Sequence, residues 1–436
     1  MKKNILILAL VLSGLNVVEA QDTLAPSEAI QIGLENHFDI RLVRLDAQIA
    51  ENNLSLGNAG FLPRIDLNAG QNFSVTDSKQ EFLSGTVNDR KGARSSALNA
   101  GAQLNWTLFD GLQMFIGYDR LQEMQQKSEL QLLLTVEYAV QQILGQYYQL
   151  VNLKQQLRVL DKTIRLDQER LQLAENMLAI GSGSRLDLLQ AQVDLNADSA
   201  ALLGLLDRQQ QTKALLNQLL ARDARTLFEV ADTFNLRHDL VFDQLAASMM
   251  ERNTSLGLAQ NDERQSLLLL REIRGRQLPS LGFTMGYNFL NQQSESGFIS
   301  SNRSSGMTYG LQANMSLFDG FNTQREKRNA NILIQSSRIR TESLISELNN
   351  ELTRHFDSHN SKMRLLSMER QNLMAASENL NIASERYRIG DLSGIEFREA
   401  QKNYMVAEGR LLQTILETKL VELQLLQLAG MLATEQ

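Results

Sequence analysis

One stretch of this chain, about ninety residues long, occurs twice. In each copy the tetrapeptide Leu-Phe-Asp-Gly, ending at Gly111 and at Gly320, is followed by a long segment without proline and then by an Ile-Gly turn at Ile180 and at Ile389. Both pairs of residues are 209 positions apart. A constant spacing without gaps over this length indicates an internal duplication, which constrains the fold before any local pattern does.

The two repeats, 21–222 and 223–436, are rich in residues that favour helices, such as Leu, Gln, Ala and Glu. The two repeats share a period of about half the chain, so we expect them to interdigitate rather than to fold as separate domains. The only prolines are Pro26, Pro63 and Pro279, which leaves room for very long uninterrupted helices.

Residues 1–20 have the pattern of a signal peptide. Lys2 and Lys3 form its basic start, Ile5–Leu15 its apolar run, and Val18-Glu19-Ala20 a cleavage site with small residues. The chain has no cysteine, which excludes disulfides, thiolate metal ligands and a cysteine nucleophile. The formal charge of −7 provides no basic surface for nucleic acid.

Four segments alternate strictly between apolar and small polar residues, as strands do. They lie at about 64–76, 97–109, 280–290 and 307–318, with polar loops expected over 76–96 and 291–306. A tilted strand of about ten residues crosses a bilayer. A soluble sheet with one face on a core shows the same alternation. The signal peptide and the uncharged polar face favour a membrane β-barrel, which four strands cannot close, so several chains must share it.

A long helix with coiled-coil spacing is predicted after each Leu-Phe-Asp-Gly turn, over about 110–180 and 319–389. Hairpins then return the chain in helices over about 185–220 and 395–432. Each return helix has half the length of its partner, so helices over 27–56, starting near Ser27, and over 241–277 are expected to complete the columns. The predicted fold class is mainly α with a membrane β-barrel.

The strand-to-helix turns contain Asp110, Gly111, Asp319 and Gly320. We expect each aspartate to cap the following helix and each glycine to permit the sharp turn. A catalytic aspartate is disfavoured, because no base or nucleophile accompanies either one.

This combination resembles the outer-membrane efflux protein family of TolC-like channel-tunnels. Paired Leu-Pro turns at Pro63 and Pro279, both Leu-Phe-Asp-Gly turns and both hairpins carry the resemblance across the mature chain. It implies a homotrimer in the outer membrane with a twelve-stranded barrel and a helical tunnel through the periplasm. It also implies efflux or type I secretion, with a periplasmic adaptor and an inner-membrane pump of RND, ABC or MFS type as partners.

The resemblance places a pore constriction at the hairpin tips, at Glu396, Glu399 and the first-repeat residue Asp187. A ring of carboxylates would attract cations. The alternative is that these acids only stabilise the first turns of the return helices. A basic residue that the family has beside the second hairpin is Leu392 here, so the arginines expected to supply latch contacts instead are Arg185, Arg388 and Arg398.

An adaptor is expected to dock in the grooves around the exposed hairpin tips. The expected docking residues are Gly181, Ser184, Arg185, Gly390, Ser393 and Gly394.

No active site is evident, and no cofactor or metal is expected. His355 and His359 are four apart, but HFDSH lacks the glutamate of the zincin motif, so a solvated helix face is the preferred interpretation. No phosphate-binding loop is present, so a duct would be passive. The alternative function is a soluble periplasmic coiled-coil scaffold or adaptor, and the exported substrate is not specified by these patterns.

Overall fold

The computed structural model describes residues 23–432, which form two compact units. The helical unit contains residues 23–43, 132–254 and 345–432, and the sheet unit contains residues 44–131 and 255–344. Each unit takes segments from both repeats, so neither repeat forms a unit by itself. The signal peptide expected over 1–20 lies outside the described residues.

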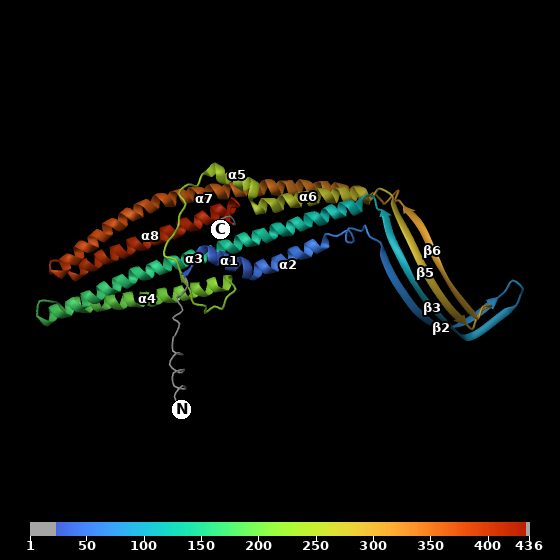
Figure 1. The fold of residues 1–436 in the computed structure, drawn as a ribbon, viewed down its shortest axis with the longest axis horizontal. Helices are drawn as coiled ribbons and strands as arrows, with labels where there is room; N and C mark the ends of the chain where they lie inside the picture. The colour runs from blue at the N-terminus through green and yellow to red at the C-terminus, as the bar shows by residue number, and fades with distance from the viewer. Residues whose placement is uncertain (1–22, 433–436) are drawn as a thin grey trace, which may run out of the picture. The chain divides into compact units, whose positions relative to one another are not determined.

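The helices repeat with the same spacing as the sequence. In each repeat a long helix is followed by a shorter one, α3 by α4 and α7 by α8 (Figure 1). α3 (Gln113–Ala179) and α7 (Asn322–Arg388) have 67 residues each, while α4 (Arg185–Leu219) and α8 (Gly394–Leu428) have 35 each. All four starts and ends are displaced by 209 positions between the repeats. The long helices stop at Gly181 and Gly390, whose φ angles of 78° and 80° reverse the chain in a conformation that glycine tolerates best.

The other two helical segments are each interrupted once. α1 (Pro26–Asn36) and α2 (Phe38–Asn53) replace the single helix predicted over 27–56, because His37 has an extended ψ of 126°. Ser27 is not the cap, since α1 begins at Pro26 with Ala25 in the N-cap position. α5 (Phe242–Arg252) and α6 (Thr254–Gly275) replace the second one, with a break at Asn253.

None of the helices within residues 23–432 combines the length and apolar character needed to cross a lipid bilayer.

The sheet unit contains one antiparallel sheet in the order β2-β3-β5-β6. Its strands are β2 (Arg64–Glu81), β3 (Val87–Phe109), β5 (Ser280–Ser294) and β6 (Ser301–Asn314). The prediction of a loop over 76–96 is wrong, because β2 and β3 continue as a paired ribbon to a short turn after Glu81. The fourth strand also starts and ends earlier than predicted, and its pairing with β5 begins at Ser301.

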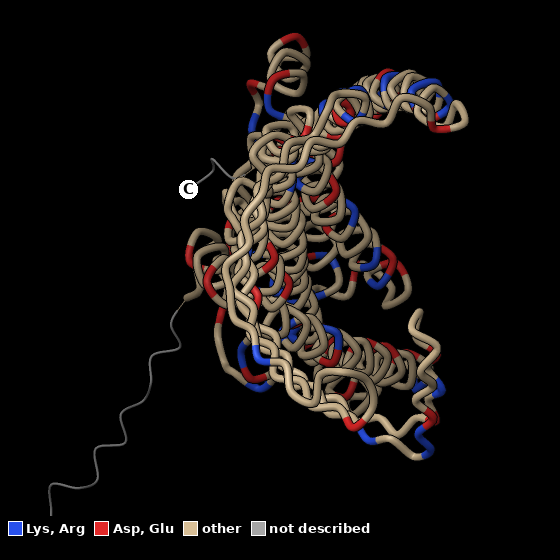
Figure 2. Tube along the Cα trace, turned by 90° about the vertical axis from the view of Figure 1, so that its right-hand side faces the viewer, with Lys and Arg blue, Asp and Glu red and all other residues tan. Residues whose placement is uncertain are grey.

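The two faces of this sheet differ in polarity. Large apolar side chains on one face are strongly exposed, including Leu67 at 83%, Phe73 at 75% and Tyr309 at 75%. The opposite face carries glycine and amide residues, such as Gly101 beside Asn68 and Asn288. The four-stranded part of the sheet carries few charged residues (Figure 2). In one chain alone this apolar face remains uncovered.

The main core lies in the helical unit, around Tyr147 of α3. The Tyr147 hydroxyl donates to the carbonyl of Leu24 at 2.9 Å and accepts from the amide of Ala231 at 3.1 Å. It thereby joins α3 to a two-stranded parallel sheet of β1 (Thr23–Leu24) and β4 (Glu229–Val230). A second cluster, around Tyr387 and Phe397, packs α7 against α8 near the hairpins.

Candidate functional site

The candidate site lies at the hairpin ends of α3, α4, α7 and α8, all within the helical unit. Ser184 caps α4 by accepting a hydrogen bond from the amide of Leu186 at 3.1 Å. Ser393 caps α8 in a reciprocal capping box, since Glu396 accepts from the Ser393 amide at 3.0 Å and Ser393 accepts from the Glu396 amide at 3.3 Å. Both serines therefore shape the tips themselves.

The three acids predicted at the pore occupy different environments. Glu396 is exposed, and hydrogen bonds from Ser393 lower the pKa of its carboxyl below its usual value. Asp187 holds the corresponding place in the first turn of α4 and is half-buried. Its Oδ1 lies 3.7 Å from the point where a Cβ on Gly394 would sit, so the two tips are in close contact. Glu399 is exposed.

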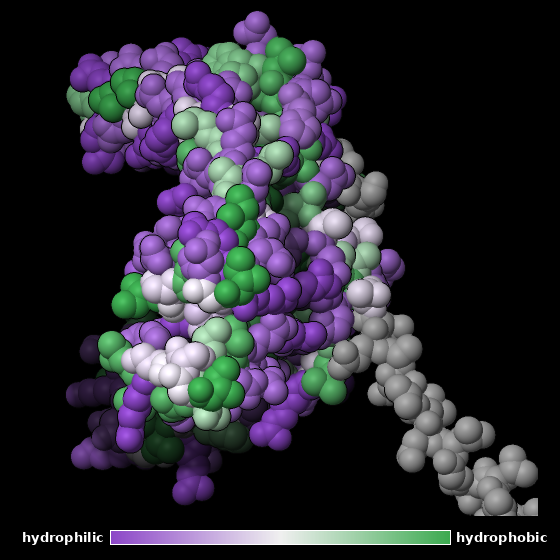
Figure 3. All heavy atoms as spheres, turned by 90° about the vertical axis from the view of Figure 1, so that its left-hand side faces the viewer, coloured by the Kyte–Doolittle hydropathy of each residue, from purple (hydrophilic) through white to green (hydrophobic). Residues whose placement is uncertain are grey.

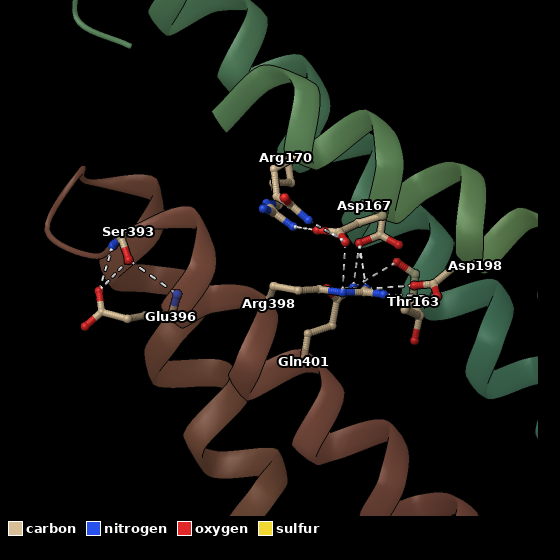
Figure 4. A network of polar contacts seen from close by, with 10 residues as sticks. Thr163, Asp167, Arg170, Asp198, Ser393, Glu396, Arg398 and Gln401 are labelled. Atoms are coloured by element: carbon tan, nitrogen blue, oxygen red, sulfur yellow. Dashed lines mark hydrogen bonds and ion pairs between the residues drawn. The ribbon is translucent and has the colours of Figure 1, made fainter. Parts of the chain in front are cut away.

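A buried polar network lies behind the tips and joins α8 to α3 and α4 (Figure 4). Arg398 donates to both carboxylate oxygens of Asp198, at 2.7 and 3.1 Å, which is a bidentate pair. The same guanidinium lies 3.5 Å from Asp167 and 3.7 Å from Asp194. Gln401 donates to Asp167 at 2.8 Å. The network therefore connects residues 200 or more positions apart.

A second arginine belongs to the same network. Arg170 of α3, whose side chain is 2% exposed, donates to Asp194 of α4 at 2.7 Å. Among the described residues, the Arg170 Nε and Nη2 atoms and Asp167 Oδ2 are buried without a hydrogen-bond partner. Three carboxylates and two guanidiniums share this space, so the network has more acids than bases.

Burial and the close charged neighbours change the pKa values of two of these acids. Burial raises the pKa of Asp167 to about 7, with a further contribution from neighbouring Asp198. Burial also opposes ionisation of Asp198, but the hydrogen bonds from Arg398 outweigh it and hold the pKa of that carboxyl below its usual value. Asp167 is therefore the group of the network whose protonation changes near neutral pH.

Of the three arginines predicted as latch residues, only Arg398 reaches this network. Arg388 lies 3.9 Å from Glu169 of α3, in a contact exposed to solvent. Arg185 is exposed at the first position of α4. Sequence reasoning missed Arg170, Asp194, Asp198 and Gln401. A signal existed only for Asp167, which lies in the coiled-coil seam where an apolar residue is expected.

The tips also carry exposed apolar side chains that were not among the docking residues expected from the sequence. Ile180 and Leu186 flank the first hairpin turn, with exposed fractions of 79% and 68%. Their repeat counterparts Ile389 and Ile395 flank the second, with 77% and 67%. Figure 3 views this end, where apolar side chains lie among polar ones. Each tip thus presents one pair of large apolar residues beside its Gly and Ser residues.

The two strand-to-helix turns of the sheet unit differ in their capping. Asp319 accepts from the Thr323 amide at 2.8 Å and from the Thr323 hydroxyl, which lowers the pKa of Asp319. Asp110 offers only its backbone carbonyl, to Gln113 at 2.7 Å, and its Oδ1 is buried without a partner among the described residues. Gly111 and Gly320 have φ angles of 75° and 70°.

The histidine pair of α7 does not form a solvated face. His359 is 3% exposed, and burial lowers the pKa of its imidazole. Within residues 23–432 no three His, Cys, Asp or Glu side chains are grouped so that they could hold a metal ion.

The sequence profile described as outer membrane efflux protein matches residues 29–222 and 245–431. Among curated proteins, none matches the chain.

Several solved structures share the fold. A membrane protein from Pseudomonas aeruginosa matches with a TM-score of 0.77 and 17% identity, over 93% of this chain and 90% of that one. The CmeC outer membrane channel of Campylobacter jejuni matches with a TM-score of 0.77 and 16% identity, over 93% and 85%. The MtrE outer membrane channel of Neisseria gonorrhoeae, in its open state, matches with a TM-score of 0.70 and 16% identity, over 93% and 89%.

Proposed function

The chain belongs to the outer membrane efflux protein family, and on that premise we propose that it is a passive exit duct built from three copies. The strands of the three copies form one twelve-stranded barrel in the outer membrane, and the helices form a tunnel in the periplasm. An inner-membrane pump of RND, ABC or MFS type supplies the energy and is linked to the duct by a periplasmic adaptor. The family is one of channel proteins rather than enzymes.

The observation that carries this proposal is the open-edged sheet with an exposed apolar face. β2 and β6 are the edge strands, each paired on one side only within the chain. Free backbone groups on an edge strand cannot lie in lipid, so a membrane sheet must close. Pairing β6 of one copy with β2 of the next closes a barrel with the apolar face toward lipid.

Two helices of the sheet unit, α2 and α7, support the same assembly. Leu45 and Ile49 of α2 are 55% and 57% exposed, and Ile332 and Ile339 of α7 are 62% and 64% exposed. Spacings of four and seven residues place each pair on one helix face. An exposed apolar stripe on each of these helices is suited to packing against the neighbouring copy.

The molar mass of the protein extracted in mild detergent tests the shared barrel. Light scattering should give three chains per particle, and removal of detergent should precipitate them. A water-soluble monomer would instead favour the alternative function of a soluble periplasmic scaffold or adaptor. Such a monomer would have to cover the apolar sheet face within one chain.

Glu396, Glu399 and Asp187 are proposed to ring the periplasmic entrance. The capping box supports a fixed position for Glu396, because two hydrogen bonds hold it to Ser393. The double variant Glu396→Gln with Glu399→Gln removes charge while a glutamine at 396 still accepts the cap bond. Cation preference in planar bilayers should fall. Unchanged ion selectivity would place the constriction elsewhere.

The adaptor is proposed to dock on the tips at Gly181, Ser184, Arg185, Gly390, Ser393 and Gly394, and on the apolar pairs beside them. Ile180→Asp with Ile389→Asp should weaken adaptor cross-linking and export together, because a charge would replace exposed apolar surface. Ser184→Asp with Ser393→Asp adds charge to the same tips and should also weaken cross-linking, although aspartate can still cap α4 and α8. Intact cross-linking in the isoleucine variant would contradict this docking surface.

A further inference from the structure

The strand ends that lie farthest from the helices carry a two-stranded extension, which the proposed duct does not require. β2 and β3 stay paired well beyond the last β3–β5 pair, Ser95 with Ser294. We call residues 77–92 the outer ribbon. At its base the pairing shifts between Thr76 and Ser78, and Asp77 accepts from the Gly92 amide at 2.6 Å. Gly92 has a φ of 66° there, so a bulge redirects the ribbon.

The outer ribbon is polar on both faces. Its charged residues are three acids and three bases, namely Asp77, Lys79, Glu81, Asp89, Arg90 and Lys91. Lys79 pairs in register with Asp89, and Ser78 pairs with Arg90. Neither face could enter an apolar lipid layer without desolvating charges. The ribbon therefore extends into water beyond the membrane, and equal numbers of acids and bases allow several ribbons to approach without net repulsion.

The tip of this polar ribbon is apolar. Leu83 is fully exposed, and Phe82 packs on Phe298 of the turn between β5 and β6, with ring centroids 4.3 Å apart. Phe298 and Ile299 are themselves 83% and 64% exposed. We call Phe82, Leu83, Phe298 and Ile299 the tip patch. An apolar patch on a charged stem in water indicates a contact with another apolar surface.

We propose that the tip patches of three copies meet over the outer mouth of the shared barrel and form an apolar constriction there. This inference rests on the proposed trimeric duct. The ribbon is continuous with β2, the edge strand that faces the next copy, and three-fold symmetry places three identical patches at one height around the mouth. A narrow apolar ring restricts ions by excluding water.

Single-cysteine variants test the contact, because the chain has no cysteine of its own. Leu83→Cys should give covalent dimers on oxidation within the detergent-extracted trimer, since a disulfide requires Cα atoms within about 7 Å. Gln80→Cys on the exposed ribbon stem is the matched control and should stay monomeric on denaturing gels. Absence of the Leu83→Cys dimer in an intact trimer would overturn the inference.

A conductance measurement gives an independent readout. Leu83→Asp with Phe298→Asp should wet the mouth and raise single-channel conductance at least about twofold, whereas Gln80→Asp should leave it unchanged. Unchanged conductance in the double variant would show that the tips do not restrict the mouth. A particle that is not a trimer would instead refute the proposed function, so the two failures are distinguishable.

Discussion

The first hairpin, made of α3 and α4, and the second, made of α7 and α8, share helix lengths of 67 and 35 residues. Both turn at a glycine with positive φ, and both are capped by a serine. They differ in charge. Arg398 of α8 corresponds to Leu189 of α4, while Asp198 of α4 corresponds to Ala407 of α8.

The other charged residues of the network also lack a charged counterpart in the second hairpin. Asp167, Arg170 and Asp194 of the first hairpin correspond to neutral residues in the second, namely Ala376, Asn379 and Asn403. The acids therefore lie on one hairpin and the arginine that crosses to them lies on the other. A duplicated backbone can thus hold one buried polar contact between its halves without a second copy of that contact. We interpret this contact as the latch that holds α8 against α3 and α4.

The largest effect is expected from Arg398→Ala. It leaves the carboxylates of Asp198 and Asp167 buried without their cation, which costs on the order of 3 kcal/mol. The ends of α8 and α4 should separate, with faster hydrogen exchange at the tips and larger channel currents. Leu189→Ala changes the corresponding residue of the other repeat, which is 50% exposed, and should have little effect on either measurement. Equal effects of the two variants would mean that the asymmetry has no energetic role.

A pH-dependent effect is expected from Asp167→Asn. The pKa of Asp167 is raised from 3.8 to about 7, so the folded chain holds a proton that the unfolded chain releases. The stability from this group is complete below about pH 4, falls as the pH rises, and is lost above about pH 7. The asparagine variant should therefore be more stable at pH 8, by about 2 kcal/mol, with a flatter profile of melting temperature between pH 4 and 7. If the profile of melting temperature against pH did not change, other titrating groups would be responsible for its slope.

A smaller effect is expected from removing the serine caps of α8 and α4. Ser393→Ala removes two side-chain hydrogen bonds, one donated to the Glu396 carboxylate and one accepted from the Glu396 amide, whereas Ser184→Ala removes a single one. The first should cost about 1 kcal/mol and the second less. Hydrogen exchange of the first turn of α8 and of α4 measures both in one experiment. A larger loss at α4 would contradict this order.

The smallest effect concerns the acids in the two first turns. Glu396 has a lowered pKa, so its contribution to stability is present above its usual value and is lost as the pH falls through the lowered one. Glu396→Gln should remove that acid-dependent part of tip stability. Asp187→Asn is the matched variant in the first repeat. If it produced the same change, the reciprocal bond to Ser393 would not be the cause.

Much of the fold followed from local patterns. The Leu-Phe-Asp-Gly turns and the two Gly-Ser hairpins predicted where strands and helices begin, because capping and positive φ depend on a few neighbouring residues. The lengths of the strands could not be predicted from local patterns. Residues 76–96 lack alternation, since both faces of the outer ribbon are polar, and pairing there is visible only in the register.

The candidate site was predicted in part. The tips and the first-turn acids are local features, and the sequence by itself determined them together with the repeat and the helix lengths. The partners of Arg398 lie 200 or more positions away, and a coiled-coil pattern says which face is buried but not which residue lies opposite. Only the tertiary structure decided which acids share one arginine, because the energy of a buried charge depends on every group within a few ångströms, whatever its place in the chain.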